Sequence, residues 1–408
     1  MELEFRHYPD ETLESFLLRL SRYQGYERFS HFAEDIWRDT LGQHEAMAGA
    51  FPFELSRVNL FHAETTSQMR VRVLMHLTNQ LELKNFSLMK IALTHSKAIF
   101  SPDYKAVYRN NIDYPFSFLR KTFTPVCSEC LAEASYIRQH WQFLPYQACH
   151  VHQCKLLHHC PECNRRIGYQ DSEIIDHCEC GYCFIGVKTE PSSDSQQSVS
   201  QWLQVSSSNS SLTESQGLFS YSCSISERYG ILLWYVNRYG EDKDINLESF
   251  IAYAQQWPQS FISDLDRQLE KAEQVRIKPW NQTFFNEGFG SLLKDCRRLP
   301  NRQIAHNKVL SSVLEYMTDL VIRNPKDKKS NVGDVLLSPL EASTLLSCTV
   351  EEIYRLYEFG EIKAGVRLKM SSKLASQQSV FTLRSVVELK LAKMTSSVDG
   401  LNLYLPEW

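Results

Sequence analysis

The feature that most constrains the fold of this 408-residue chain is a concentration of cysteines in one short segment. Nine of the twelve cysteines lie between Cys127 and Cys183. Eight of these nine occur in motifs with metal-ligand spacing, which are Cys127-x2-Cys130, Cys149-x2-His152, Cys160-x2-Cys163 and Cys178-x-Cys180-x2-Cys183. Two residues between ligands let both side chains reach one ion from a tight turn, and a second such turn completes a tetrahedral site. The pattern predicts two structural zinc ions in tandem.

Four residues fit the first site by their spacing, namely Cys127, Cys130, Cys149 and His152. His150 competes for the fourth position, but it directly follows Cys149 and fits a knuckle turn less well than a residue separated by two. Cys154 is left as a spare cysteine beside this site. Each bound zinc would supply on the order of ten kcal/mol of folding free energy, so a segment with little apolar mass can still be rigid.

The second site begins with Cys160 and Cys163, and three cysteines compete for its other two positions. Cys178 and Cys180 form a Cys-x-Cys-Gly turn, whereas Cys180 and Cys183 form a pair with the usual spacing of two. Four protein ligands at either site leave no open position for a water molecule, so neither zinc is expected to be catalytic. Since no other spacing groups acids and histidines into an active site, we predict that the chain is not an enzyme.

The overall charge of the chain argues against a freestanding nucleic-acid binder. The formal net charge is −4 and the isoelectric point is near 6.4, whereas DNA-binding proteins usually carry a basic excess that neutralises phosphates. Any contact with DNA is therefore predicted to be indirect, weak or confined to local patches.

Two further patterns predict the compartment of the protein. The residues after Met1 lack the basic and apolar pattern of a signal peptide, which favours a reducing cytoplasm and reduced cysteines over disulfides. The longest strongly apolar run, 231–236, is six residues long, far below the roughly 20 needed to span a bilayer. We therefore predict a cytoplasmic protein with no membrane segment.

The periodicity of apolar residues predicts a mainly α, multidomain chain of five segments. These are an N-terminal helix-turn-helix-like helical domain (1–125), a tandem zinc-ribbon or knuckle segment (126–188), a serine-rich linker (189–217), a helical domain (218–330) and a C-terminal helix-turn-helix-like domain (331–408). In the first segment Asp10 is expected to cap a helix that starts near Leu13. Further helices are expected to begin at Phe29, Ser67 and Ser87.

The C-terminal segment carries the sharpest helical signals. Ser338 and Thr349 each open a capping box, which predicts two capped helices joined by a short turn. Alternating apolar residues over 366–370 and at 380–381 predict a small β-wing before a last helix over 385–394. Together these elements predict a winged helix-turn-helix-like unit.

The second helix of this unit has the wrong charge for reading DNA. Residues 349–361 include four glutamates and one arginine, a net charge of −3, which would meet phosphates with repulsion. We interpret the unit as a protein-docking or dimerisation module. Its wing could still touch a phosphate backbone through basic residues, which are Lys363, Arg367, Lys369 and Lys373.

The cysteine motifs resemble those of the TniQ family of transposition proteins. The resemblance rests on a Cys-x2-Cys-Leu knuckle at 127–131, a central Trp141, the Cys149-x2-His152 pair, Leu156 and the Cys160-x2-Cys163 pair. Residues 8–19 are also similar to the opening helix of the family. These motifs cover roughly the first 185 residues, and the remainder fits only in outline.

The resemblance implies a bacterial, non-enzymatic targeting adaptor. The length, near 400 residues, is most similar to that of the short members encoded with I-F type CRISPR-associated transposons. Such members form a homodimer that binds the guide-RNA complex Cascade (Cas proteins and crRNA) and recruits an AAA+ ATPase regulator and the transposase for RNA-guided DNA integration. Because base pairing then reads the target sequence, the adaptor itself need not. The alternative is a sequence-specific DNA-binding target selector that recognises an attachment site directly.

The resemblance also implies a ligand set for each zinc. One ion would be held by Cys127, Cys130, Cys149 and His152, and the other by Cys160, Cys163, Cys178 and Cys180. Cys183 remains the alternative ligand at the second site.

Overall fold

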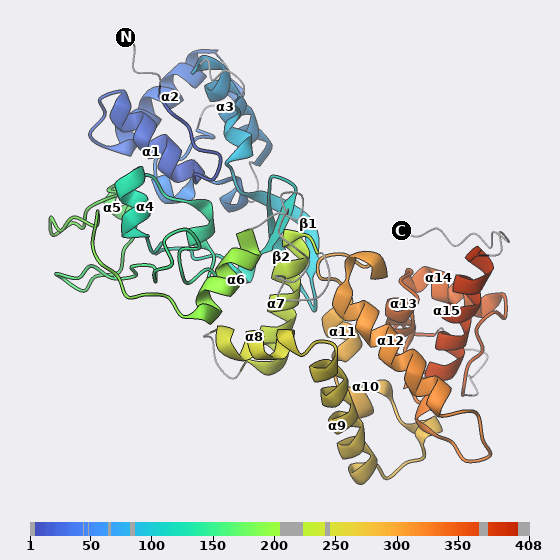
Figure 1. Cartoon of the computed structure of the whole chain (residues 1–408). Coiled ribbons are helices and arrows are strands. Elements are labelled where there is room, and N and C mark those ends of the chain that lie inside the picture. The colour runs from blue at the N-terminus through green and yellow to red at the C-terminus, as the bar shows by residue number, and fades with distance from the viewer. Residues whose placement is uncertain are drawn as a thin grey trace. The chain divides into compact units, whose positions relative to one another are not determined.

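The structure is a computed structural model that describes residues 5–43, 45–47, 49–63, 67–81, 86–204, 223–240, 245–366 and 374–398 (Figure 1). Fifteen α-helices and five short strands occur in these ranges, which confirms a mainly α fold. The chain divides into two compact units: the first is Met1–Ala98, Tyr104–Arg228 and Gly240–Ile251, and the second is Ile99–Asp103, Tyr229–Tyr239 and Ala252–Trp408. The boundaries predicted near 125 and 188 fall inside the first unit, and the five-segment division stays a prediction.

The first unit begins with three helices close to the predicted positions, which are α1 (Leu13–Tyr23), α2 (Phe29–Gln43) and α3 (Ser67–Gln80). The cap of α1 differs from the prediction. The Thr12 hydroxyl oxygen, rather than Asp10, accepts the Ser15 N–H at 3.1 Å. The Asp10 carboxylate instead accepts the Tyr136 hydroxyl at 2.9 Å, so a distant partner removes it from the capping position.

The helix predicted from Ser87 is only a single 3-10 turn, η4 (Leu88–Lys90). It leads into an antiparallel hairpin that the sequence reading overlooked. The three-stranded sheet has the order β1-β2-β3, formed by β1 (Thr94–Phe100), β2 (Tyr104–Arg109) and β3 (Ile112–Pro115). Asn110 and Asn111 connect β2 to β3 with φ values of 49° and 62°, and asparagine tolerates the left-handed conformation that a two-residue hairpin turn requires.

The cysteine-rich segment contains little regular structure. It has two short helices, α4 (Ser128–Glu133) and α5 (Tyr169–Ser172), and its strand pairing consists of isolated backbone bridges. Trp141, Tyr146 and Tyr169 are buried within it. Further 3-10 turns of the first unit are η1 (Glu45–Met47), η2 (Leu55–Arg57), η3 (Leu60–His62), η5 (Phe116–Phe118) and η6 (Gln139–Gln142).

The prediction of a serine-rich linker over 189–217 is wrong for part of this range. Residues 194–204 form helix α6 (Asp194–Gln204), and the rest of the predicted linker from 205 onward lies outside the described residues. Val199, Trp202 and Leu203 are spaced i, i+3 and i+4 and are buried, and the Trp202 ring lies 5.8 Å from that of Phe250. Three apolar residues on one face therefore outweigh the polar composition of the segment.

The segment predicted as a helical domain, 218–330, is mainly helical in its described residues. Its helices are α7 (Ile225–Tyr239), α8 (Leu247–Gln255), α9 (Gln259–Val275), α10 (Phe285–Phe289), α11 (Leu292–Cys296) and α12 (Lys308–Arg323), with 3-10 turns η9 (Trp280–Gln282) and η10 (Ile304–His306). Within the second unit, Trp234 of α7 packs in edge geometry against Trp257 and Phe261. No helix in the described ranges combines the length and apolar character that a bilayer crossing needs.

The C-terminal elements follow the predicted order. After η11 (Val332–Asp334) and β4 (Leu336–Leu337) come α13 (Pro339–Leu345), α14 (Val350–Glu358), β5 (Phe381–Thr382) and α15 (Leu383–Val398). Ser338 caps α13 in a capping box with Glu341, and the Thr349 hydroxyl oxygen accepts the Glu352 N–H at 3.2 Å to cap α14.

Strand β4, which lies before these helices in the sequence, was not predicted. β5 pairs with β4 ahead of α13, and Ala364 bridges to Phe381. Five residues of the predicted wing lie outside the described residues, namely Arg367, Leu368, Lys369, Met370 and Lys373. The winged helix-turn-helix assignment stays a prediction.

Candidate metal centres

Two groups of cysteine and histidine side chains meet in the cysteine-rich segment. The first group is Cys127, Cys130, Cys149 and His152, and the second is Cys160, Cys163, Cys178 and Cys180. In each group the candidate ligand atoms all lie within 4.8 Å of one another. Both groups could hold a metal ion, and their donors are the thiolates and imidazole that zinc prefers.

Local backbone structure positions the first group. Cys127 is the N-cap of α4, and its sulfur accepts the Cys130 N–H at 3.5 Å. The Cys149 sulfur accepts the His152 N–H at 3.4 Å in the same way. Gln153 then turns the chain back with a positive φ of 54°. Each pair therefore sits on a tight turn whose N–H groups already point at sulfur.

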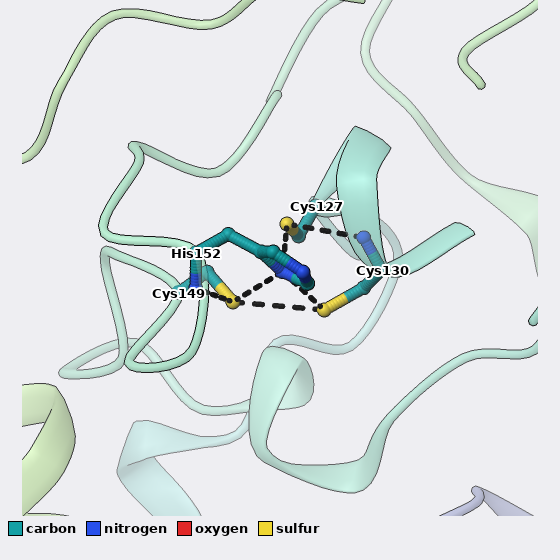
Figure 2. A group of neighbouring side chains, drawn as sticks. All are labelled: Cys127, Cys130, Cys149 and His152. Atoms are coloured by element: carbon teal, nitrogen blue, oxygen red, sulfur yellow. Dashed lines mark hydrogen bonds between the residues drawn. The ribbon is translucent and has the colours of Figure 1, made fainter. Parts of the chain in front are cut away.

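The distances in the first group match a tetrahedral ion. The four side chains converge on one point (Figure 2). The Cys130 and Cys149 sulfurs are 3.6 Å apart, and His152 Nδ1 lies 3.2 Å from the Cys130 sulfur and 3.5 Å from that of Cys127. A tetrahedral zinc with ordinary bond lengths places sulfurs about 3.8 Å apart and sulfur and nitrogen about 3.5 Å apart.

The imidazole of His152 is held from its other side by a carboxylate. Glu133 Oε1 lies 3.1 Å from His152 Nε2, while Nδ1 faces the three sulfurs. A carboxylate on the distal nitrogen fixes the tautomer and ring orientation of a metal-binding histidine. Sequence analysis missed this residue, although it stands three positions after Cys130, which is one turn further along the same helix.

The thiols of the first group lie too close together to ionise independently. Hydrogen bonds with Cys130 and Cys149 raise the pKa of Cys127, while the hydrogen bond with Cys127 lowers the pKa of Cys149. A divalent cation favours the thiolate form of every ligand, so metal binding to the group would release protons.

The second group rests on two further turns. The Asn164 N–H donates to the Cys160 carbonyl at 2.9 Å, and the Gly181 N–H donates to the Cys178 carbonyl at 2.8 Å. Asn164 and Gly181 both have positive φ, at 56° and 89°. The Cys160 sulfur lies 3.6 Å from that of Cys180, and the Cys163 sulfur lies 3.5 Å from that of Cys178. This geometry also fits four bonds to one ion.

The remaining candidates of the sequence reading lie beside these groups. Cys183 pairs with His177 and closes a hairpin over residues 177–183, here called the second hairpin. Its sulfur is not one of the four that gather. Cys154 is buried with its sulfur 3.7 Å from that of Cys127. His150 Nδ1 lies 2.7 Å from the Tyr146 hydroxyl, so this imidazole has a different partner.

The fold and the two groups define a class, namely a mainly helical protein with tandem four-ligand centres suited to structural metal. The TniQ family model matches residues 3–156 of the chain. Residues 3–156 therefore carry a TniQ domain, which supports a relation to the TniQ family of transposition proteins. The match contains the whole first group and ends before Cys160. No curated protein matches the chain.

Proposed function

We propose that the chain is a target-selection adaptor of a transposon, which holds other macromolecules together and catalyses no reaction itself. The observation that carries this proposal is the pair of four-ligand groups within and beside a TniQ domain. Four protein ligands around each ion leave no site for a metal-bound water, so the metal would stiffen the scaffold. The eight residues named above would be the ligands of two structural zinc ions.

The particular adaptor we propose belongs to a CRISPR-associated transposon. It would act as a homodimer that binds Cascade and recruits the AAA+ regulator and the transposase for RNA-guided DNA integration. A net charge of −4 supports a role in which base pairing, rather than the adaptor, reads the target sequence. Contact of the adaptor with the target DNA would be indirect or weak.

The C-terminal helix α14 is the surface we propose for protein docking. Glu351 and Glu358 are exposed along it, and Phe359 just beyond its end is 77% exposed. An exposed aromatic side chain within an acidic surface is typical of a protein interface and unfavourable for phosphate binding. We therefore propose that the α13–α14 unit binds a protein partner or the second copy of the chain.

A retention experiment tests this function. The purified chain is applied to an immobilised guide-RNA complex at moderate salt, beside a variant with Glu351→Lys and Glu352→Lys. The matched control carries Glu248→Lys and Glu270→Lys, which change the same charge at exposed positions on α8 and α9. We expect the native chain and the control to be retained and the α14 variant to be lost.

One outcome would favour the alternative function. If the guide-RNA complex retains neither the native chain nor the control, while the chain alone binds one duplex sequence with strong salt dependence, the chain is a direct DNA-binding target selector. Cleavage or joining of a substrate by the chain alone would instead contradict both functions.

A further inference from the structure

A basic groove lies in the first unit beside the cysteine groups. Its volume is about 600 Å³, and four of its lining residues are cationic, namely Arg120, Lys121, Lys155 and Arg166. His158 and His159 also line it, and none of the described residues that line it is acidic. Within a chain of net charge −4, this is a local concentration of positive charge. Such a concentration attracts a polyanion.

The wall of the groove is built largely by segments that lie next to the candidate metal ligands in the sequence. Val126 bridges to Leu157, and His159 bridges to Arg166. The Thr124 N–H donates to the Ile167 carbonyl at 3.0 Å. Val126 directly precedes Cys127 and His159 directly precedes Cys160, so two of these paired segments lead straight into candidate metal ligands.

The cations of the groove are held in place in different ways. Arg120 donates to the main-chain carbonyls of Trp141 and Phe143 at 2.8 and 2.6 Å. Carbonyls carry no net charge, so these bonds do not neutralise the guanidinium. Lys155 pairs with Glu190 at 2.7 Å. Lys121 and Arg166 are both exposed and lie over aromatic rings. These two exposed cations are therefore the ones best placed for an incoming anion.

An aromatic ring accompanies this charge. Phe123 lines the groove and is 39% exposed, and the Arg166 guanidinium lies 5.3 Å from the centre of its ring. Cations that follow a phosphate backbone, together with an aromatic side chain on which a base can stack, are the combination that binds single strands. A duplex keeps its bases stacked on one another, so it cannot use the ring in this way.

We infer that this groove binds an unpaired nucleic-acid strand. Lys121 and Arg166 would contact its phosphates, and Phe123 would stack against one of its bases. This inference goes beyond the proposed adaptor role and does not depend on it, since a free strand needs neither a guide-RNA complex nor the α14 surface.

Binding of fluorescent oligonucleotides to the full-length, zinc-loaded chain tests the inference. Three probes are compared, namely oligouridine RNA and oligodeoxyuridine DNA of about 16 nucleotides and a DNA duplex of the same length. Fluorescence anisotropy is measured between about 50 and 200 mM salt. We expect both single strands, or one of them, to bind more tightly than the duplex. The two single strands show whether the sugar hydroxyl contributes.

Two variants locate the binding. Lys121→Glu with Arg166→Glu should weaken single-strand binding by about tenfold or more and reduce the slope of log affinity against log salt by about 1.4, the value for two lost phosphate contacts. Phe123→Ala should weaken it about fivefold or more without changing that slope. The matched control is Lys294→Glu with Lys326→Glu, exposed positions of the second unit that give the same change in net charge. The control should bind within about twofold of the native chain.

Zinc content and circular dichroism establish that each variant is folded. The inference is overturned if the native chain binds neither single strand, or if the folded groove variant loses no more affinity than the control. It is equally overturned if the duplex binds more tightly than both strands and Phe123→Ala changes nothing. None of these results bears on retention by the guide-RNA complex, so the two proposals fail separately.

Discussion

The two cysteine groups differ in how deeply they sit in the first unit. Cys127, Cys130 and Cys149 are each at most 1% exposed and belong to the hydrophobic core of this unit. In the second group only Cys160 is buried, and Cys180 is exposed. The first group also has a carboxylate behind its histidine. The comparison teaches that the same four-ligand chemistry can form the centre of a core or stiffen a surface hairpin.

The first cysteine group is the inner one and the second is the outer one. Removing a ligand of the inner group should have the largest effect on stability. Cys127→Ser takes away one ligand and leaves Cys130 and Cys149 buried beside the partly exposed His152. The loss of on the order of ten kcal/mol of metal binding is comparable with the entire net stability of a typical domain, about 5–15 kcal/mol. We expect the first unit to unfold, as measured by thermal denaturation and limited proteolysis. A variant that keeps native protease resistance would show that the inner group does not support the core.

The corresponding change in the outer group should be milder. Cys160→Ser should release one zinc ion per chain and leave the inner core folded, because Cys160 is the one ligand of its group inside that core, whereas Cys163 and Cys178 only pack against it. Zinc stoichiometry would fall from two to one, and a protease would cut first near the second hairpin. Equal destabilisation by Cys160→Ser and Cys127→Ser would remove the distinction between the two groups.

A change in zinc affinity alone should distinguish the two competing ligands of the outer group. Cys180→Ser should strongly lower the zinc affinity of this group. Cys183→Ser should leave that affinity nearly unchanged, since the Cys183 sulfur lies outside the four that gather. Competition with a chromogenic chelator measures both affinities. The reverse order would show that the metal recruits Cys180 and Cys183 as its second pair.

The smallest effect concerns the carboxylate that orients His152. Glu133→Gln keeps the size of the side chain but removes its charge, and the Glu133 side chain is 59% exposed. We expect about a tenfold loss of zinc affinity at the inner group, the lower end of what such partners contribute. The outer group is the internal control and should not change. Unchanged affinity at both groups would mean that the histidine is oriented without Glu133.

Much of the fold could be predicted because its signals are local. Short stretches of sequence determine the start of α2, the caps at Ser338 and Thr349, and the spacing of the cysteine pairs. A cap or a knuckle needs only a few neighbouring residues, so tertiary structure rarely overrides it.

The errors arose where distant contacts or weak signals decide. Asp10 does not cap α1 because its partner, Tyr136, is 126 positions away. The turn at Asn110 and Asn111 is a hairpin signal that the helical reading of the region concealed. For Cys183, spacing alone favours a knuckle, and only the fold of the hairpin shows which sulfurs gather.

The connection between the two groups has a mechanical consequence. Seven residues separate His152 from Cys160, and four of them are paired to neighbouring backbone, namely Cys154, Lys155, Leu157 and His159. Such a short, anchored connection cannot bend like a hinge. A displacement of the second hairpin would therefore be transmitted to the first cysteine group as a rigid-body rotation.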